Sequence, residues 1–150
     1  MRKKNGTLGD ILKIDLKNGS YAFGRVLKSP LIAFYDVASE TQTPPEGLLS
    51  RDILFKVWVM KSAFKSKNWV IIGNSPIDTP LMEDPWFFKI DPISKKFSRY
   101  KDGIEVPAFR EECLHLERAA AWSPEHIEDR LRDYFMGIPN KWVESLKCPT

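Results

Sequence analysis

The chain has 150 residues, of which 43% are hydrophobic and 29% are charged, and its formal net charge is +3. This composition is typical of one globular domain, residues 1–150, that can fold without disulfides or a structural metal. Its longest apolar stretches are far shorter than the roughly 20 residues of a membrane-spanning helix, so we expect no membrane contact. No apolar segment of about 7–15 residues follows the basic start, so we expect no secretory signal. Because Cys113 and Cys148 form no Cys-x-x-Cys pair, the sequence predicts reduced thiols and a cytoplasmic protein.

Charge is unevenly distributed along the chain. Residues 1–30 carry a net charge of +5, whereas residues 111–150 carry −3. The basic residues form no dense block, so we interpret the first segment as a solvated surface, with residues 1–8 flexible.

A β-hairpin is predicted at residues 10–28. Apolar and polar residues alternate on both sides of Asn18 and Gly19, a pair that favours a type I′ turn because both of its central residues need a positive φ. Gly24, inside the second strand, predicts a bulge or the close approach of another backbone.

Short strands with turns between them continue to residue 101. The apolar and β-branched segments that predict them are residues 31–37, 53–60, 69–72, 86–90 and 97–100. The proline-rich residues 38–50 are predicted to form a loop. We therefore expect an α+β fold with a strongly curved antiparallel β-sheet or partial barrel over residues 9–101.

An amphipathic helix is predicted at residues 124–136. Ser123 is suited to cap its start, Pro124 to occupy its first turn and Gly137 to end it. The helix has an apolar stripe, expected to pack on the sheet, of Ile127, Leu131, Tyr134 and Phe135. Its other face carries Glu125, Glu128, Asp129, Arg132 and Asp133. A short second helix after Pro139 is expected to place Trp142 and Leu146 against the body of the protein.

Residues for catalysis or metal binding are scarce. The only histidines are His115 and His126, and neither lies in a motif for nucleophilic or acid–base catalysis. Cys113 and His115 lack a second ligand pair at zinc spacing, and no glycine-rich phosphate-binding loop is present. The sequence therefore predicts no catalytic residue, no metal and no cofactor. An enzyme would need a pocket that joins one histidine to carboxylates distant in the sequence.

Several motifs in order resemble the bacterial immunity protein 26 family over most of residues 8–147. They are Gly9-Asp10-Ile11-x-x-Ile14-x-Leu16, Tyr21-Ala-Phe-Gly-Arg-Val-Leu27, Trp69-Val-Ile-Ile-Gly73, Leu116-Glu-Arg-Ala-Ala-x-Trp122, His126-Ile-Glu-x-Arg-Leu131 and Gly137-Ile-Pro-Asn-x-Trp142. Residues 38–50 and 76–85 match no part of that pattern.

The resemblance implies a cytoplasmic antitoxin of a polymorphic or contact-dependent toxin system. Such a protein binds its cognate toxin domain and neutralises it sterically, without catalysis, and we expect it to be a monomer when free. A toxin with a basic substrate groove would be contacted by an acidic surface. The candidate toxin-binding residues are Glu125, Glu128, Asp129 and Asp133.

The alternative function is that of a small β-barrel nucleic-acid-binding protein. Its binding platform would combine basic and aromatic side chains of the first hairpin, namely Lys13, Lys17, Tyr21, Phe23 and Arg25. Such binding would weaken steeply as the salt concentration rises.

Overall fold

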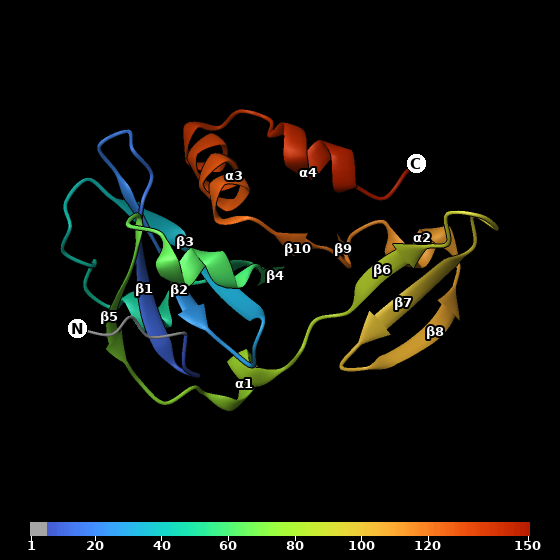
Figure 1. The fold of residues 1–150 in the computed structure, drawn as a ribbon, viewed down its shortest axis with the longest axis horizontal. Helices are drawn as coiled ribbons and strands as arrows, with labels where there is room; N and C mark the ends of the chain where they lie inside the picture. Colours follow the sequence, from blue (N-terminus) through green and yellow to red (C-terminus); the bar gives the residue numbers. More distant parts are fainter. Residues whose placement is uncertain (1–5) are drawn as a thin grey trace.

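The computed structural model describes residues 6–150, so most of the N-terminal segment expected to be flexible, residues 1–5, lies outside the described residues. Two β-sheets lie side by side, and helices α3 and α4 lie over them (Figure 1). The first sheet has six strands in the order β10-β4-β3-β2-β1-β5, and the second has four in the order β8-β7-β6-β9. The strands are β1 (Asp10–Asp15), β2 (Tyr21–Val26), β3 (Leu31–Ser39), β4 (Ile53–Val59), β5 (Trp69–Asn74), β6 (Phe87–Ile90), β7 (Phe97–Lys101), β8 (Ile104–Ala108), β9 (Glu117–Arg118) and β10 (Ala121–Trp122). The helices are η1 (Leu48–Ser50), η2 (Lys61–Lys65), α1 (Thr79–Met82), α2 (Arg110–Cys113), α3 (Pro124–Met136) and α4 (Lys141–Leu146).

The predicted hairpin is confirmed, but its turn differs from the prediction. Positive φ angles occur at Lys17 and Gly19 rather than at Asn18 and Gly19. The N–H of Leu16 donates to the carbonyl of Ser20, so three residues lie between the last paired positions and a two-residue type I′ turn does not form. The Asn18 side chain completes the turn by accepting hydrogen bonds from the backbone N–H and hydroxyl of Ser20.

The prediction for Gly24 is confirmed. The register between β2 and β3 shifts between Ala22 and Gly24, which marks a bulge. A Cβ atom at this position would lie 3.0 Å from the carbonyl oxygen of Ala33, so the neighbouring strand leaves little room for a side chain.

Alternation along the strands gives the six-stranded sheet two different faces. We call the one on which α3 packs the covered face. Its core consists of Leu12, Ile14, Leu16, Ala22, Val26, Ile32, Phe34, Phe55, Val57, Val59 and Trp69, together with Ile127 and Leu131 of α3. The other, which we call the opposite face, carries Phe23, Arg25 and Tyr35. Residues 75–86 and η1 pack over parts of it.

The strands expected at 86–90 and 97–100 form part of a second sheet rather than a continuation of the first. Pro76, Pro80 and Pro85 interrupt the chain between β5 and β6, and a residue without an N–H cannot extend a strand ladder. After this segment β6 pairs with β7, and β7 pairs with β8 across a turn at Asp102 and Gly103. The α+β class with a C-terminal helix is confirmed, and the open, curved strands are divided between two sheets.

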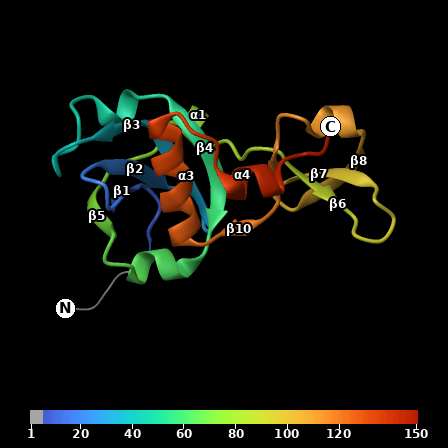
Figure 2. The ribbon, with the colours of Figure 1, turned by 90° about the horizontal axis from the view of Figure 1, so that it is seen from above.

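Helix α3 is confirmed with the expected bounds. The Ser123 hydroxyl accepts from the His126 N–H, and Gly137 ends the helix with a φ of 73°. Tyr134 departs from the predicted apolar stripe, because it is 45% exposed and donates its hydroxyl to the Asp36 carboxylate. Helix α4 follows, with Trp142 and Leu146 packed against the core as expected, and it lies between α3 and the second sheet (Figure 2).

Candidate functional site

The residues considered for catalysis are not brought together. The His126 ring stacks on Trp142, with 3.6 Å between centroids, and His115 is exposed. Cys113 and Cys148 are free thiols buried in one apolar cluster, and burial, followed by the nearby Cys148, raises the pKa of Cys113. Within residues 6–150, no three His, Cys, Asp or Glu side chains form a group that could hold a metal ion.

None of the helices in that range has the length and apolar character needed to cross a bilayer.

Glu128, proposed from the sequence as a surface residue, is buried. Only 3% of it is exposed, and its carboxylate accepts hydrogen bonds from Trp69 Nε1 at 2.8 Å and from Asn68 Nδ2 at 3.4 Å. The assignment of Glu128 to the solvent face of the helix was therefore wrong. The indole N–H of a buried tryptophan needs an acceptor. Glu128 lies next to the buried Ile127 on α3, so its side chain can turn toward β5 and accept that hydrogen bond.

Two more of the four predicted acidic residues join α3 to α4. Asp129 accepts hydrogen bonds from Arg132 and, at 3.0 Å, from Trp142 Nε1. Asp133 accepts from Asn140 Nδ2 at 2.9 Å, and the other end of the Asn140 amide caps the first turn of α4. Within residues 6–150, Glu125 alone of the four is exposed and accepts no side-chain hydrogen bond.

The basic and aromatic platform expected for nucleic-acid binding does not form. Phe23 is fully buried and Arg25 is 2% exposed, so neither can stack on a base or meet a phosphate at the surface. Lys13 and Tyr21 do lie together, with the ammonium 5.6 Å from the ring centroid. The expectation failed because Phe23 and Arg25 point to the interior of the opposite face, where residues 75–86 cover part of the sheet.

A cavity of about 520 Å³ opens on the opposite face beside Arg25. We call it the Arg25 pocket, and it is lined by Arg25, Tyr35, Leu49, Arg51, Asp52, Ile53, Lys56, Ser75, Pro76, Asp78, Pro80 and Leu81. The Arg25 guanidinium donates to the Tyr35 hydroxyl at 3.2 Å and to the carbonyl oxygens of Ser75 at 2.8 Å and Pro76 at 3.4 Å. These bonds hold the chain after β5 against the sheet.

Lys56 fixes the other side of the pocket. Its ammonium donates to the carbonyl oxygens of Leu81 at 3.1 Å and Glu83 at 2.8 Å. Burial lowers the pKa of Lys56, although the carboxylates of Glu83 and Asp84 act against this shift. The pocket therefore has a basic side chain on β2 and another on β4, each bonded to the backbone of the segment that follows β5.

This pocket was not predicted, although the sequence of β2 contains a signal for it. Because side chains alternate along β2, Arg25 points to the same side of the sheet as Phe23, whereas Ala22 and Val26 point to the covered face. A basic residue at an inward-facing position of a central strand is rare and needs a partner.

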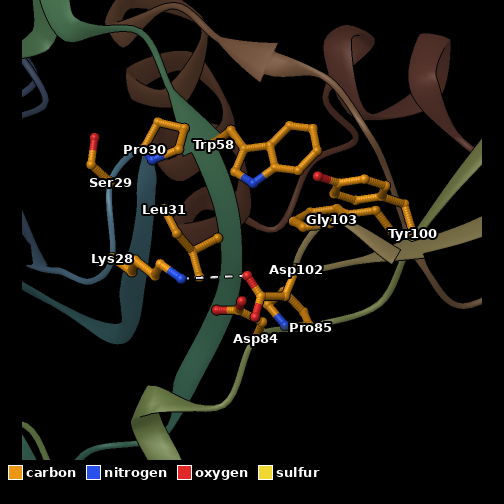
Figure 3. Close-up of a pocket in the computed structure, with 11 residues that line it drawn as sticks. Lys28, Ser29, Pro30, Leu31, Trp58, Asp84, Pro85, Tyr100, Asp102 and Gly103 are labelled. Atoms are coloured by element: carbon orange, nitrogen blue, oxygen red, sulfur yellow. Dashed lines mark hydrogen bonds and ion pairs between the residues drawn. The ribbon is translucent and has the colours of Figure 1, made fainter. Parts of the chain in front are cut away.

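A second, smaller cavity of about 160 Å³ lies where the two sheets meet (Figure 3). Trp58 of β4 and Tyr100 of β7 meet edge to face across it, with 5.6 Å between centroids. Lys28 and Asp102 form an ion pair at its mouth, at 3.4 Å, with side-chain exposures of 70% and 62%. Such an exposed pair contributes little stability, so the contact between the sheets here depends on the apolar cluster that includes Leu31, Trp58 and Phe87.

One comparison with known proteins gives a match. A family model described as "Immunity protein 26" matches residues 7–99. This segment contains every residue of the Arg25 pocket and ends before α3. No curated protein and no solved structure matches the chain.

Proposed function

The chain belongs to the immunity protein 26 family, and on this premise we propose that it binds the cognate toxin of a bacterial polymorphic toxin system and neutralises it by steric occlusion. The observation that carries the proposal is the family match over residues 7–99. The free thiols lie buried in an apolar cluster and His126 is stacked on Trp142, which is compatible with a binding role. In this proposal the chain is not an enzyme and needs no cofactor.

The proposal also places the protein in the cytoplasm, as a monomer before it meets the toxin. The toxin acts inside the cell that the immunity protein protects, so the two must meet there. Buried, free cysteines are compatible with a reducing compartment.

A titration of the purified toxin with the purified chain tests occlusion. An inhibitor that only binds acts by mass action, so we expect toxin activity to disappear at about one molar equivalent when both concentrations are well above Kd. Complete inhibition at about a hundredth of the toxin concentration would overturn the proposal, because only a catalyst could act at that ratio.

The acidic surface of α3 remains a candidate contact for a toxin with a basic groove. Because Glu128 is buried, this surface consists of Glu125, Asp129 and Asp133. Asp129 and Asp133 accept hydrogen bonds inside the described part of the chain, so Glu125 is the residue that can be changed without breaking one. The variant Glu125→Lys should weaken inhibition if this surface meets the toxin. Glu111→Lys, exposed on α2 beside the second sheet, makes the same charge change away from both faces of the first sheet. Equal inhibition by the two variants would remove Glu125 from the contact.

A further inference from the structure

Arg25 is a buried cation that the chain leaves incompletely bonded. Its hydrogen-bond partners within residues 6–150 are a hydroxyl and two carbonyl oxygens, none of them a carboxylate, and its Nε–H has no acceptor there. Removing a charge from water costs several kcal/mol unless an opposite charge and further hydrogen bonds compensate for it. The arginine is thus held in place, but within residues 6–150 its Nε–H has no acceptor and its charge has no carboxylate partner.

The Tyr35 hydroxyl offers a second donor in the same place. Tyr35 is 1% exposed, lines the Arg25 pocket and accepts a hydrogen bond from Arg25 Nη1. A hydroxyl that accepts still has a hydrogen to donate, and no described residue from 6 to 150 receives it. A buried cation that pairs with no carboxylate within residues 6–150 and a hydroxyl with an unused hydrogen therefore lie side by side at one pocket wall.

The charges around the pocket favour an anion. Arg51 stands exposed on the rim and Lys56 lines the wall, so three basic side chains line the pocket, against the two exposed carboxylates of Asp52 and Asp78. Neither carboxylate pairs with Arg25 within 4.0 Å. The volume of about 520 Å³ leaves room for a side chain as well as water.

We propose that the Arg25 pocket binds a carboxylate supplied by an acidic side chain of the toxin, with the Arg25 guanidinium as the buried counter-ion, the Tyr35 hydroxyl as donor and Arg51 as the rim cation. Less than 1 Å² of Arg25 Nε is exposed, so the carboxylate compensates the guanidinium through its charge and accepts its hydrogen bond from the hydroxyl. Charge-assisted hydrogen bonds in a partly dry pocket give a strong contact at the centre of an interface. The inference depends on the proposed function for the source of the carboxylate, and it places the toxin on the opposite face, away from α3.

Two other buried N–H groups in residues 6–150 also lack an acceptor, and one of them provides an internal control. Trp122 Nε1 is uncharged and lies in the core of the covered face. Arg99 Nε belongs to the second sheet, where the guanidinium lies 4.7 Å from the Trp86 ring centroid and 4.0 Å from Glu112. Neither residue lines the Arg25 pocket.

The first experiment uses acetate as the probe, without any toxin. The Nε–Hε resonances of the ¹⁵N-labelled chain are followed while sodium acetate replaces sodium chloride at constant ionic strength, and the Arg25 signal is assigned from its loss in Arg25→Lys. We expect a saturable shift of the Arg25 resonance and no saturable shift of the Arg99 resonance. An Arg25 resonance that stays still, or that moves only as the Arg99 resonance does, would overturn the pocket as an anion site.

Variants on the surface test the rim without disturbing the fold. Arg51→Glu reverses the rim charge at an exposed position and should weaken acetate binding by about tenfold. Lys61→Glu makes the same charge change on η2, beyond the other end of β4, and should leave acetate binding unchanged. Equal acetate affinity in the two variants would remove Arg51 from the site.

The second experiment identifies the source of the carboxylate. Arg51→Glu should weaken inhibition of the toxin by about tenfold or more, whereas Lys61→Glu should inhibit as the original chain does. Acetate binding combined with unchanged inhibition by Arg51→Glu would overturn the toxin as the source and assign the pocket to a free oxyanion. A chain that binds acetate but inhibits no toxin would overturn the proposed function itself, while its pocket would still bind anions.

Discussion

The two faces of the six-stranded sheet treat their buried charges differently. On the covered face, each oxygen of the buried Glu128 carboxylate accepts a hydrogen bond, one from Trp69 and the other from Asn68. On the opposite face, Arg25 is just as inaccessible and lines a cavity, but its Nε–H has no acceptor within residues 6–150.

This difference separates charges that stabilise the fold from a charge available for binding. A buried polar group whose bonds are all made inside the chain can only lose energy when a partner approaches. A buried charge that lines a cavity can gain an interaction with a partner, so it is the better place to look for a contact. In this protein that criterion favours the opposite face over the acidic helix.

The largest expected effect is on the covered face, from Leu131→Ala. Leu131 is fully buried between α3 and the sheet, so its truncation should lower the free energy of unfolding by about 3 kcal/mol. Urea denaturation followed by tryptophan fluorescence measures this. Met136→Ala, on the exposed side of the same helix, should cost less than about 0.5 kcal/mol. Similar losses in both variants would mean that α3 does not pack as described.

Glu128→Ala comes next and tests whether Glu128 is the buried acceptor of the Trp69 indole N–H. It leaves the Trp69 indole N–H without its acceptor inside the protein, so we expect a loss of about 2 kcal/mol in the free energy of unfolding. Glu128→Gln keeps an acceptor oxygen and should recover part of that stability. If the alanine variant were as stable as the original chain, Glu128 would not be the buried acceptor that we describe.

Arg25→Met tests most directly whether Arg25 contributes less to stability than Glu128 does. Replacing Arg25 with an apolar side chain of similar length removes a charge that is costly to bury, but it also removes the hydrogen bonds to Tyr35, Ser75 and Pro76. These three residues line the pocket, where water can replace the lost donor, so the net cost should be about 1 kcal/mol or less. The same variant should bind acetate more weakly than the original chain when heat of binding is measured. A loss in unfolding free energy as large as that of Glu128→Ala would show that Arg25 serves the fold in the way that Glu128 does.

The smallest effect is expected from Glu125→Gln. The Glu125 carboxylate lies in the first turn of α3, where a negative charge interacts favourably with the helix dipole. Removing it should lower the free energy of unfolding by about 0.5 kcal/mol at low salt, and by less when salt screens the interaction. Thermal unfolding at two ionic strengths measures the difference. An effect independent of salt would contradict this electrostatic explanation.

Local patterns in the sequence predicted the elements whose causes are local. The capped helix at 124–136 and the hairpin around Asn18 follow from side chains within a few residues of one another. The division into two sheets was not predicted, since it depends on pairings distant in sequence. One of these pairs β6 in parallel with the two-residue strand β9, which is too short to show a period.

The candidate site was less accessible to sequence analysis than the fold. Charge on a helix indicates a solvated face on average, but Glu128 turns inward because Trp69, which is 59 residues away, needs an acceptor. Arg25 was assigned to a surface for another reason, because small β-barrels bind nucleic acid through basic and aromatic residues of their strands. Its burial depends on the segment at Ser75 and Pro76 that folds back over the sheet, a contact across 50 residues with no local signature.

The outer strand of the second sheet has a consequence for self-association. β8 is five residues long and contains Pro107, which offers no N–H to an approaching strand, and its Glu105 carboxylate is bonded to Lys89 and Ser98. Short, proline-bearing, charged strands are poor templates for edge-to-edge pairing. The one-to-one inhibition that we propose requires the chain to be in excess over its target. The form of β8 makes this edge a poor site for self-association at that excess.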